Sequence, residues 1–173
     1  MDSGFTHSGC TNGQGHDTMT GKTITYYGTT VCAGFTGSDY HGLSVAHVAA
    51  GVQSAGVMGV APSASLHLST YSNSNGETNF PDHWAAATNA ASSAIVQNNS
   101  WGIDEQLDDV QTYITNNGFT TDAGVASVWS LYGYTANATS VSNYITALNN
   151  FQSHGVIVYA LSNSTSFTEA DFQ

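Results

Sequence analysis

The sequence predicts an α/β fold in which a doubly wound, mainly parallel β-sheet is flanked by helices. Apolar runs of strand length alternate with helix-like segments from residue 41 onward, as in sheets built from strand–helix–strand units. Polar residues suited to catalysis follow several of these runs, and ligands of such sheets bind outside the carboxyl ends of the strands. The length of 173 residues and the hydrophobic content of 40% suffice for one domain with a core.

The first half of the chain predicts two strands and two helices. Residues 23–27 are expected to form a short strand among loops rich in Gly, Thr and Ser. A helix is expected from His41 to the region of Gly56, because apolar residues recur there at helical spacing. Its predicted buried stripe consists of Val45, Val48, Ala49 and Val52. Residues 65–69 alternate in polarity as a strand does, and residues 82–93 predict the second helix.

The second half predicts two strands, a helix and an insertion. Residues 94–98 are expected to form a strand, whereas residues 103–139 show no clean period and hold most of the acidic residues. We therefore predict a surface insertion at about 103–139, helical in part around 107–114. Five apolar residues then share one helical face: Val141, Tyr144, Ile145, Leu148 and Phe151. His154-Gly155 ends this helix, and the apolar run 156–160 predicts a buried strand.

The charge balance excludes several kinds of partner. Lys22 is the single basic residue against twelve Asp and Glu, which gives a net charge of −11. No cation cluster can therefore neutralise nucleic-acid phosphates or an anionic membrane surface, and no apolar run approaches a membrane span. Ser, Thr, Asn and Gly supply the polar surface, a composition found in secreted or salt-adapted proteins, and we expect a secreted or cell-surface location. Cys10 and Cys32 fit a disulfide or two free thiols equally well.

Residues of types that can act in catalysis lie at positions where the predicted fold would place an active site. Asp2 lies at the start of the chain, His41 opens a helix and Asn163 follows the strand at 156–160. A further tripeptide follows the strand that ends near residue 99: Ser100, Trp101 and Gly102. Together these residues supply a base, a carboxylate to orient it and an amide donor for an oxyanion, which is the set that acyl transfer needs.

Five blocks of sequence, in this order and at this spacing, resemble the subtilase family of serine endopeptidases. They are Asp2-Ser3-Gly4, the helix opening with His41-Gly42, Gly59-Val60-Ala61-Pro62, Asn98-Asn99-Ser100-Trp101-Gly102 and residues 156–163. The resemblance implies a subtilisin-like sheet and covers most of residues 1–173, with 103–139 outside it. Asp-Ser-Gly and His-Gly are common on their own, so the order of the five blocks carries the resemblance.

The resemblance implies a role for each candidate residue. His41 would take the proton of a nucleophilic serine, and Asp2 would hold its imidazole in the required tautomer. Asn163 would donate its side-chain amide to the oxyanion, and Ser100, Trp101 and Gly102 would pair with the backbone of a polypeptide substrate. The alternatives stay open: Asn163 also lies in a glycosylation sequon, and Trp101 is nearly as well explained as a core residue.

The sequence departs from the family pattern in three ways. His47 stands where the family has a glycine that permits close helix packing, and Tyr159 to Asn163 replaces a run of small residues. No Gly-Thr-Ser block, which would hold the nucleophile, occurs in the 173 residues. We therefore expect a partial peptidase domain, truncated at both ends and inactive alone; a propeptide or an autotransporter barrel in the full-length protein is a further hypothesis.

Other functions remain to be weighed against the peptidase. A non-catalytic peptide-binding or adhesion module could keep the scaffold without the serine, whereas a different hydrolase on such a sheet would need a Gly-x-Ser-x-Gly elbow, which is absent. We expect no metal site and no cofactor, because the histidines lack a zinc-site spacing and no calcium-loop motif occurs. Calcium is implied by the family resemblance alone.

Overall fold

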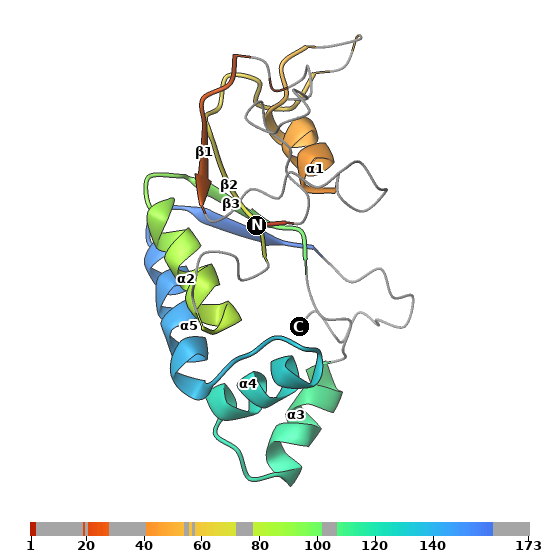
Figure 1. Ribbon diagram of the computed structural model, residues 1–173, viewed down its shortest axis with the longest axis vertical. Coiled ribbons are helices and arrows are strands. Elements are labelled where there is room, and N and C mark those ends of the chain that lie inside the picture. Colours follow the sequence, from red (N-terminus) through yellow and green to blue (C-terminus); the bar gives the residue numbers. More distant parts are fainter. Residues whose placement is uncertain are drawn as a thin grey trace.

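The computed structural model describes residues 1–2, 19, 21–27, 41–53, 56, 58–71, 78–101 and 107–160. Within these ranges the chain alternates strands and helices, which confirms the predicted α/β class (Figure 1). The elements, in order, are β1 (Ile24–Tyr27), α1 (His41–Ala50), β2 (Leu66–Ser69), α2 (Phe80–Ala90), β3 (Val96–Asn99), α3 (Leu107–Asn116), α4 (Thr121–Leu131), α5 (Ala138–Gln152) and β4 (Val156–Tyr159).

The described strands form two parallel pairs. β1 pairs with β2, with Ile24 opposite Leu66, and β3 pairs with β4, with Val96 opposite Val156. Each pair is joined through at least one helix, as parallel strands require. The prediction of parallel strands is therefore confirmed for both pairs.

Residues Met1 and Asp2 lie between the two pairs and hydrogen-bond to both. On one side Asp2 N donates to Ser69 O (3.1 Å) and Tyr71 N donates to Asp2 O (3.0 Å). On the other side Met1 N donates to Asn98 O and Ser100 N donates to Met1 O (3.1 Å). Because β2 and β3 flank the same dipeptide, the carboxyl ends of these two strands lie on either side of Asp2.

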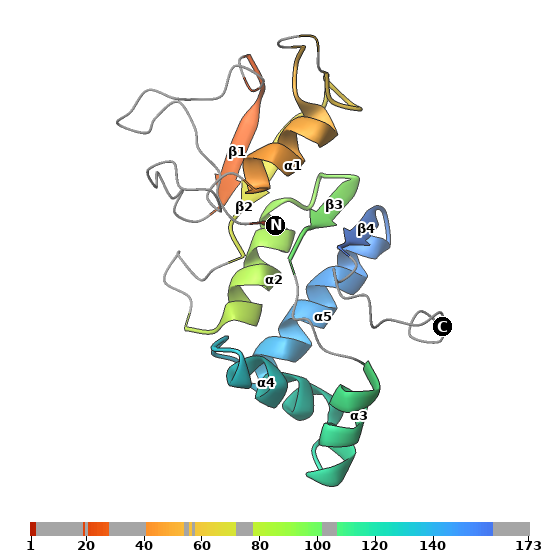
Figure 2. The same cartoon turned by 90° about the vertical axis from the view of Figure 1, so that its right-hand side faces the viewer.

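Helices α1 and α2 cover opposite faces of β1 and β2. Side chains of a strand alternate between its two faces, and the core of α1, with Leu43 and Ala46, packs with Leu66 and Leu68 of β2. The alternate residue Ser69 faces His83 of α2, whose ring nitrogen lies 3.5 Å from Ser69 Oγ. The two views show α1 apart from the α2 and α5 pair (Figures 1 and 2). The face occupied by α1 is called the α1 face below.

The largest core surrounds Trp84 in α2, whose side chain is 0% exposed. Five aromatic rings, one from α2 itself and four from other parts of the chain, lie within 4.2–6.2 Å of it, between ring centroids: Phe80, Trp101, Trp129, Tyr134 and Tyr144. Because these residues come from α2, the segment after β3, α4, the α4–α5 connection and α5, this aromatic core joins elements far apart in sequence.

The segment predicted as an insertion holds two helices, of which the sequence pattern indicated one. α3 agrees with the helical part expected around 107–114, whereas α4 was not predicted. The two helices pack closely, because a Cβ at Gly124 of α4 would lie 2.3 Å from Ile114 Cγ1 of α3. α4 also reaches the aromatic core through Trp129, so tertiary packing stabilises a helix that has no clear apolar period of its own.

Three predictions of buried surface are wrong. In α1 the buried residues are Gly42, Leu43, Ala46 and Ala50, whereas Val48 of the predicted stripe is 64% exposed. In α5, Ile145 is 47% exposed although Val141, Tyr144 and Phe151 are buried as expected. In β4, Val156 and Val158 are exposed rather than buried. Apolar spacing alone does not show which of two adjacent helix faces meets the sheet.

Helix α1 ends at Ala50, earlier than predicted, because another segment binds its last carbonyls. Gly59 N, Val60 N and Ala61 N donate to Gly51 O, Val48 O and Ala49 O, respectively, at 2.9–3.0 Å. Gly51 also makes room for His47, since a Cβ at residue 51 would lie 2.3 Å from His47 Nδ1. His47 is therefore accommodated in α1 despite replacing a glycine of the family pattern.

Gly59→Ala should destabilise the protein. A Cβ at residue 59 would lie 2.5 Å from Gly51 N and from His47 O, and neither backbone atom can move without disturbing the end of α1. We expect the free energy of unfolding to fall by about 1–3 kcal/mol, measured by urea denaturation followed by circular dichroism. The neighbouring change Val60→Ala, at a side chain that is 88% exposed, should alter it by less than about 0.5 kcal/mol. Equal midpoints for the two variants would contradict this prediction.

Candidate active site

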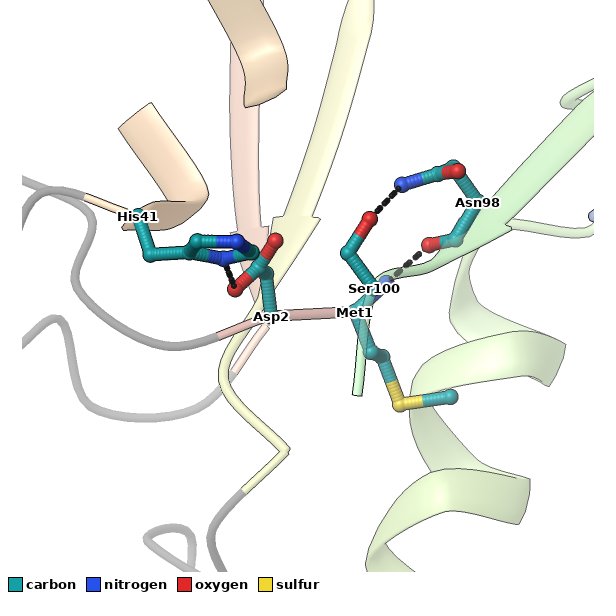
Figure 3. A network of polar contacts seen from close by, with 5 residues as sticks. All are labelled: Met1, Asp2, His41, Asn98 and Ser100. Atoms are coloured by element: carbon teal, nitrogen blue, oxygen red, sulfur yellow. Dashed lines mark hydrogen bonds and ion pairs between the residues drawn. The ribbon is translucent and has the colours of Figure 1, made fainter. Parts of the chain in front are cut away.

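The site is centred on a hydrogen bond between Asp2 and His41. The Nδ1–H of His41 donates to Asp2 Oδ1 across 2.6 Å, as Figure 3 shows. Asp2 is buried, with a side chain that is 3% exposed, whereas the His41 side chain is 56% exposed. The carboxylate therefore contacts one nitrogen of the imidazole from inside the protein while the ring itself remains accessible from solvent.

Local structure explains why these two residues meet. Asp2 is fixed in the sheet by backbone hydrogen bonds toward β2, and its side chain points to the α1 face together with Leu68 and Thr70. His41 is the first residue of α1, which packs on that face through Leu43 and Ala46. The start of α1 thus brings the imidazole to the carboxylate at the end of β2.

Ser100 lies on the same face as Asp2. Met1 is opposite Asn99 in the backbone ladder, so Asn98 and Ser100 share the face of Asp2 by alternation. Asn98 Nδ2 donates to Ser100 Oγ across 2.6 Å, and the close-up places this pair beside Met1 and Asp2 (Figure 3). The segment that was predicted to bind a substrate backbone therefore begins next to the Asp2–His41 pair.

Trp101 points away from that pair and into the aromatic core. Its ring centroid lies 4.2 Å from that of Trp84 and 6.1 Å from that of Tyr71, against which it stacks. These contacts favour the interpretation of the Trp101 side chain as a core residue. A role in substrate binding would then rest on its backbone alone.

Several predicted residues lie outside the described residues. Gly102 and Asn163 are among them, as are Cys10 and Cys32, so their predicted roles and pairing stay predictions. The structure describes the strand before Asn163: β4 lies beside β3, and Ala160 N donates to Asn99 O across 2.9 Å. Ala160, the last described residue before Asn163, therefore lies at the same edge of the sheet as Ser100.

Sequence reasoning missed three buried polar side chains near the site, namely His83, Trp84 and Asn99, each 0% exposed. His83 Nε2 donates to Thr70 O (3.0 Å) and Trp84 Nε1 donates to Tyr71 O (2.6 Å). Asn99 Oδ1 accepts from Gln97 Nε2 (3.2 Å), and its Nδ2 has no hydrogen-bond partner among the described residues. The pattern His-Trp in an Ala-rich helix was the available signal, because large polar rings are unusual there.

The described ranges contain no cluster of three or more His, Cys, Asp or Glu side chains that could hold a metal ion. None of the helices in those ranges combines the length and the apolar character that a membrane span requires. The contact that the structure describes at the site is between an imidazole and a carboxylate, a combination that can provide an oriented base.

Comparison with known families decides the assignment. A model described as the subtilase family matches residues 33–171. The chain belongs to the subtilase family. Searches of curated proteins and of solved structures gave no significant match. Membership places the chain among serine peptidases, whose substrates are polypeptides.

The subtilase match includes His41, Ser100 and Asn163, whereas Asp2 lies before it. The pairing of Asp2 with His41 therefore rests on the geometry of the site rather than on the family match.

Proposed function

We propose that this chain carries the base half of a serine endopeptidase site, with His41 as general base and Asp2 as the carboxylate that orients it. The single observation that carries the proposal is the 2.6 Å hydrogen bond between His41 Nδ1 and the buried Asp2 Oδ1 in a member of the subtilase family. A proton held on Nδ1 leaves Nε2 as the basic nitrogen, which is the tautomer that can accept a proton from a hydroxyl group.

The nucleophile in this proposal is a serine from outside residues 1–173. No Gly-Thr-Ser block occurs among them, so we expect the 173-residue chain to hydrolyse no peptide by itself. His41 would accept the serine proton during attack on the peptide carbonyl and return it to the leaving amine. Asn163 would stabilise the oxyanion, and the backbone from Ser100 to Gly102 would pair with an extended substrate.

The sheet supports this proposal if the Met1–Asp2 segment is its central strand. The strand order would then be β1, β2, Met1–Asp2, β3, β4, with α1 on one face and α2 and α5 on the other, which is a doubly wound arrangement. Ligands of such sheets bind at the carboxyl ends of the strands where the direction of winding changes. Asp2, His41 and Ser100 lie at that point in the proposed order.

We also propose that the protein acts outside the cytoplasm, at the cell surface or as a secreted enzyme. The support is compositional: charged residues make up 8% of the chain, and Ser, Thr, Asn and Gly provide the polar surface. The proposal includes no cofactor, and calcium binding would rest on family resemblance alone. A propeptide or an autotransporter barrel remains a hypothesis for the full-length protein.

A fluorophosphonate probe, which labels activated serines, tests the proposed function. We expect labelling of the full-length gene product at a serine outside residues 1–173, and no labelling of the 173-residue chain. His41→Ala in the full-length protein should abolish labelling, whereas His154→Ala, at an exposed histidine after α5, should leave it unchanged. Cleavage of casein at internal bonds, read by mass spectrometry, would support endopeptidase action.

Two results would overturn the proposal. Labelling of the isolated 173-residue chain would show that a nucleophile lies within it. A full-length protein that is folded, unlabelled and still binds extended peptides would support the non-catalytic peptide-binding module instead.

A further inference from the structure

The backbone that holds Asp2 depends on the end of β2. Asp2 hydrogen-bonds to Ser69 O and to Tyr71 N, which flank Thr70, and Thr70 is directly opposite Asp2 in a parallel bridge. The register of β1 with β2 ends at Tyr27 opposite Ser69. Among the described residues, Thr70 and Tyr71 thus lie beyond the register of β1 with β2.

Side chains of α2 bind both of these carbonyls. His83 Nε2 donates to Thr70 O (3.0 Å), and because a carbonyl oxygen can only accept, Nε2 carries the proton. The next residue on the helix binds the next carbonyl on the strand, since Trp84 Nε1 donates to Tyr71 O (2.6 Å). Both side chains are 0% exposed, so water does not readily replace either donor. Thr70 O also accepts from Ser69 Oγ (3.1 Å), so loss of the His83 donor would weaken the hydrogen bonding of this carbonyl rather than abolish it.

Packing leaves these two rings little freedom to move. The Tyr27 ring lies 5.4 Å from the His83 ring, between centroids, and Trp84 is surrounded by the aromatic core. Trp101, the residue after Ser100, is part of the same core, with its ring 4.2 Å from Trp84. Side chains packed on the face of the sheet opposite His41 therefore contact the end of β2 and the segment after β3, which lie on either side of Asp2.

We propose that His83 and Trp84 are positioning residues, which hold the Thr70–Tyr71 backbone so that the Asp2 carboxylate stays on Nδ1 of His41. This inference rests on the proposed function, in which that contact selects the tautomer of the base. Neither residue touches a substrate: both act through β2, from the face of the sheet opposite the site.

Nitrogen-15 NMR of His41 in the 173-residue chain, in mildly alkaline buffer, tests this inference because the ¹⁵N shifts report which ring nitrogen bears the proton. In the parent chain the Nδ1–H tautomer should predominate. His83→Leu removes one donor and Trp84→Phe removes the other while keeping an aromatic ring. Each should lower the ratio of Nδ1–H to Nε2–H, by roughly tenfold for His83→Leu, toward the ordinary preference of imidazole for Nε2–H.

Two control variants separate positioning from stability. His83→Gln retains an N–H donor that can face Thr70 O and should restore most of the tautomer ratio. Val141→Ala removes buried volume from α5, at a side chain that is 2% exposed, and should lower stability while leaving the ratio unchanged. Circular dichroism establishes that each variant is folded before its spectrum is interpreted.

The outcomes distinguish the two proposals. A parent chain that itself shows the ordinary tautomer preference overturns the proposed function of Asp2 and His41. The positioning role alone is overturned if the Nδ1–H tautomer predominates in the parent chain and the folded His83→Leu and Trp84→Phe variants keep the same tautomer ratio. If His83→Leu does not fold, Trp84→Phe and His83→Gln decide the result. A lower ratio of Nδ1–H to Nε2–H in Val141→Ala would also count against a positioning role.

Discussion

Asp2→Asn is expected to lower kcat of the proposed full-length, serine-bearing enzyme by about 10⁴-fold. The amide is almost the same size as the carboxylate, so Asp2 remains a buried residue in the sheet, but its NH₂ group can donate to Nδ1 and favour the opposite imidazole tautomer. Nε2 would then carry the proton and could no longer accept one from serine. Steady-state hydrolysis of a peptide substrate measures the effect.

The loss should appear in kcat rather than in KM, because the Asp2 side chain is buried and, in the proposed mechanism, acts on His41 rather than on the substrate. Asp82→Asn, in the first turn of α2, is the matched control: it makes the same chemical change outside the site, and kcat should stay within a few-fold of the parent. An Asp2→Asn enzyme with nearly the parent kcat would show that Asp2 does not orient the catalytic base.

Trp84→Ala is expected to lower the free energy of unfolding of the 173-residue chain by about 3–5 kcal/mol. The ring is 0% exposed and contacts aromatic residues from α4, α5 and the segment after β3. Its removal leaves a cavity at the junction of these elements and also removes the donor to Tyr71 O. Urea denaturation followed by circular dichroism gives the free energy, and the loss approaches the whole stability of a typical domain.

Leu131→Ala is the control for this experiment. Leu131 ends α4 and is 69% exposed, so its truncation should change the free energy of unfolding by less than about 0.5 kcal/mol. A Trp84→Ala chain that unfolds at the same urea concentration as Leu131→Ala would mean that the aromatic core does not hold α2, α4 and α5 together.

Most elements were predictable because their signals are local. The strand at 65–69 alternates in polarity, and α5 was indicated by apolar residues three and four apart, with its end at His154-Gly155. The start of α5 has a further local cause, since Asn137 accepts from Ser140 N in a capping box. Such signals depend on neighbours within one or two helical turns.

Long-range contacts explain what was missed. α4 is stabilised by packing of Gly124 on Ile114 and of Trp129 on Trp84, and neither contact leaves a period in the local sequence. Val48 appeared to belong to a buried stripe, but the face of α1 that meets β2 is the one with Leu43 and Ala46. Which face is buried depends on the approach of the sheet, and the helix sequence alone does not contain that information.

The sequence by itself determined the family, through ordered blocks around His41, Pro62, Ser100 and Asn163, because each block combines a turn or strand end with a chemical group. Only the tertiary structure decided that Asp2 meets His41, since 39 residues separate them and backbone pairing with β2 and β3 brings them together. It also decided that Trp101 faces the core while Ser100 faces the site, because strand alternation sends consecutive side chains to opposite faces. Local sequence specifies the groups, and burial with backbone pairing specifies their geometry.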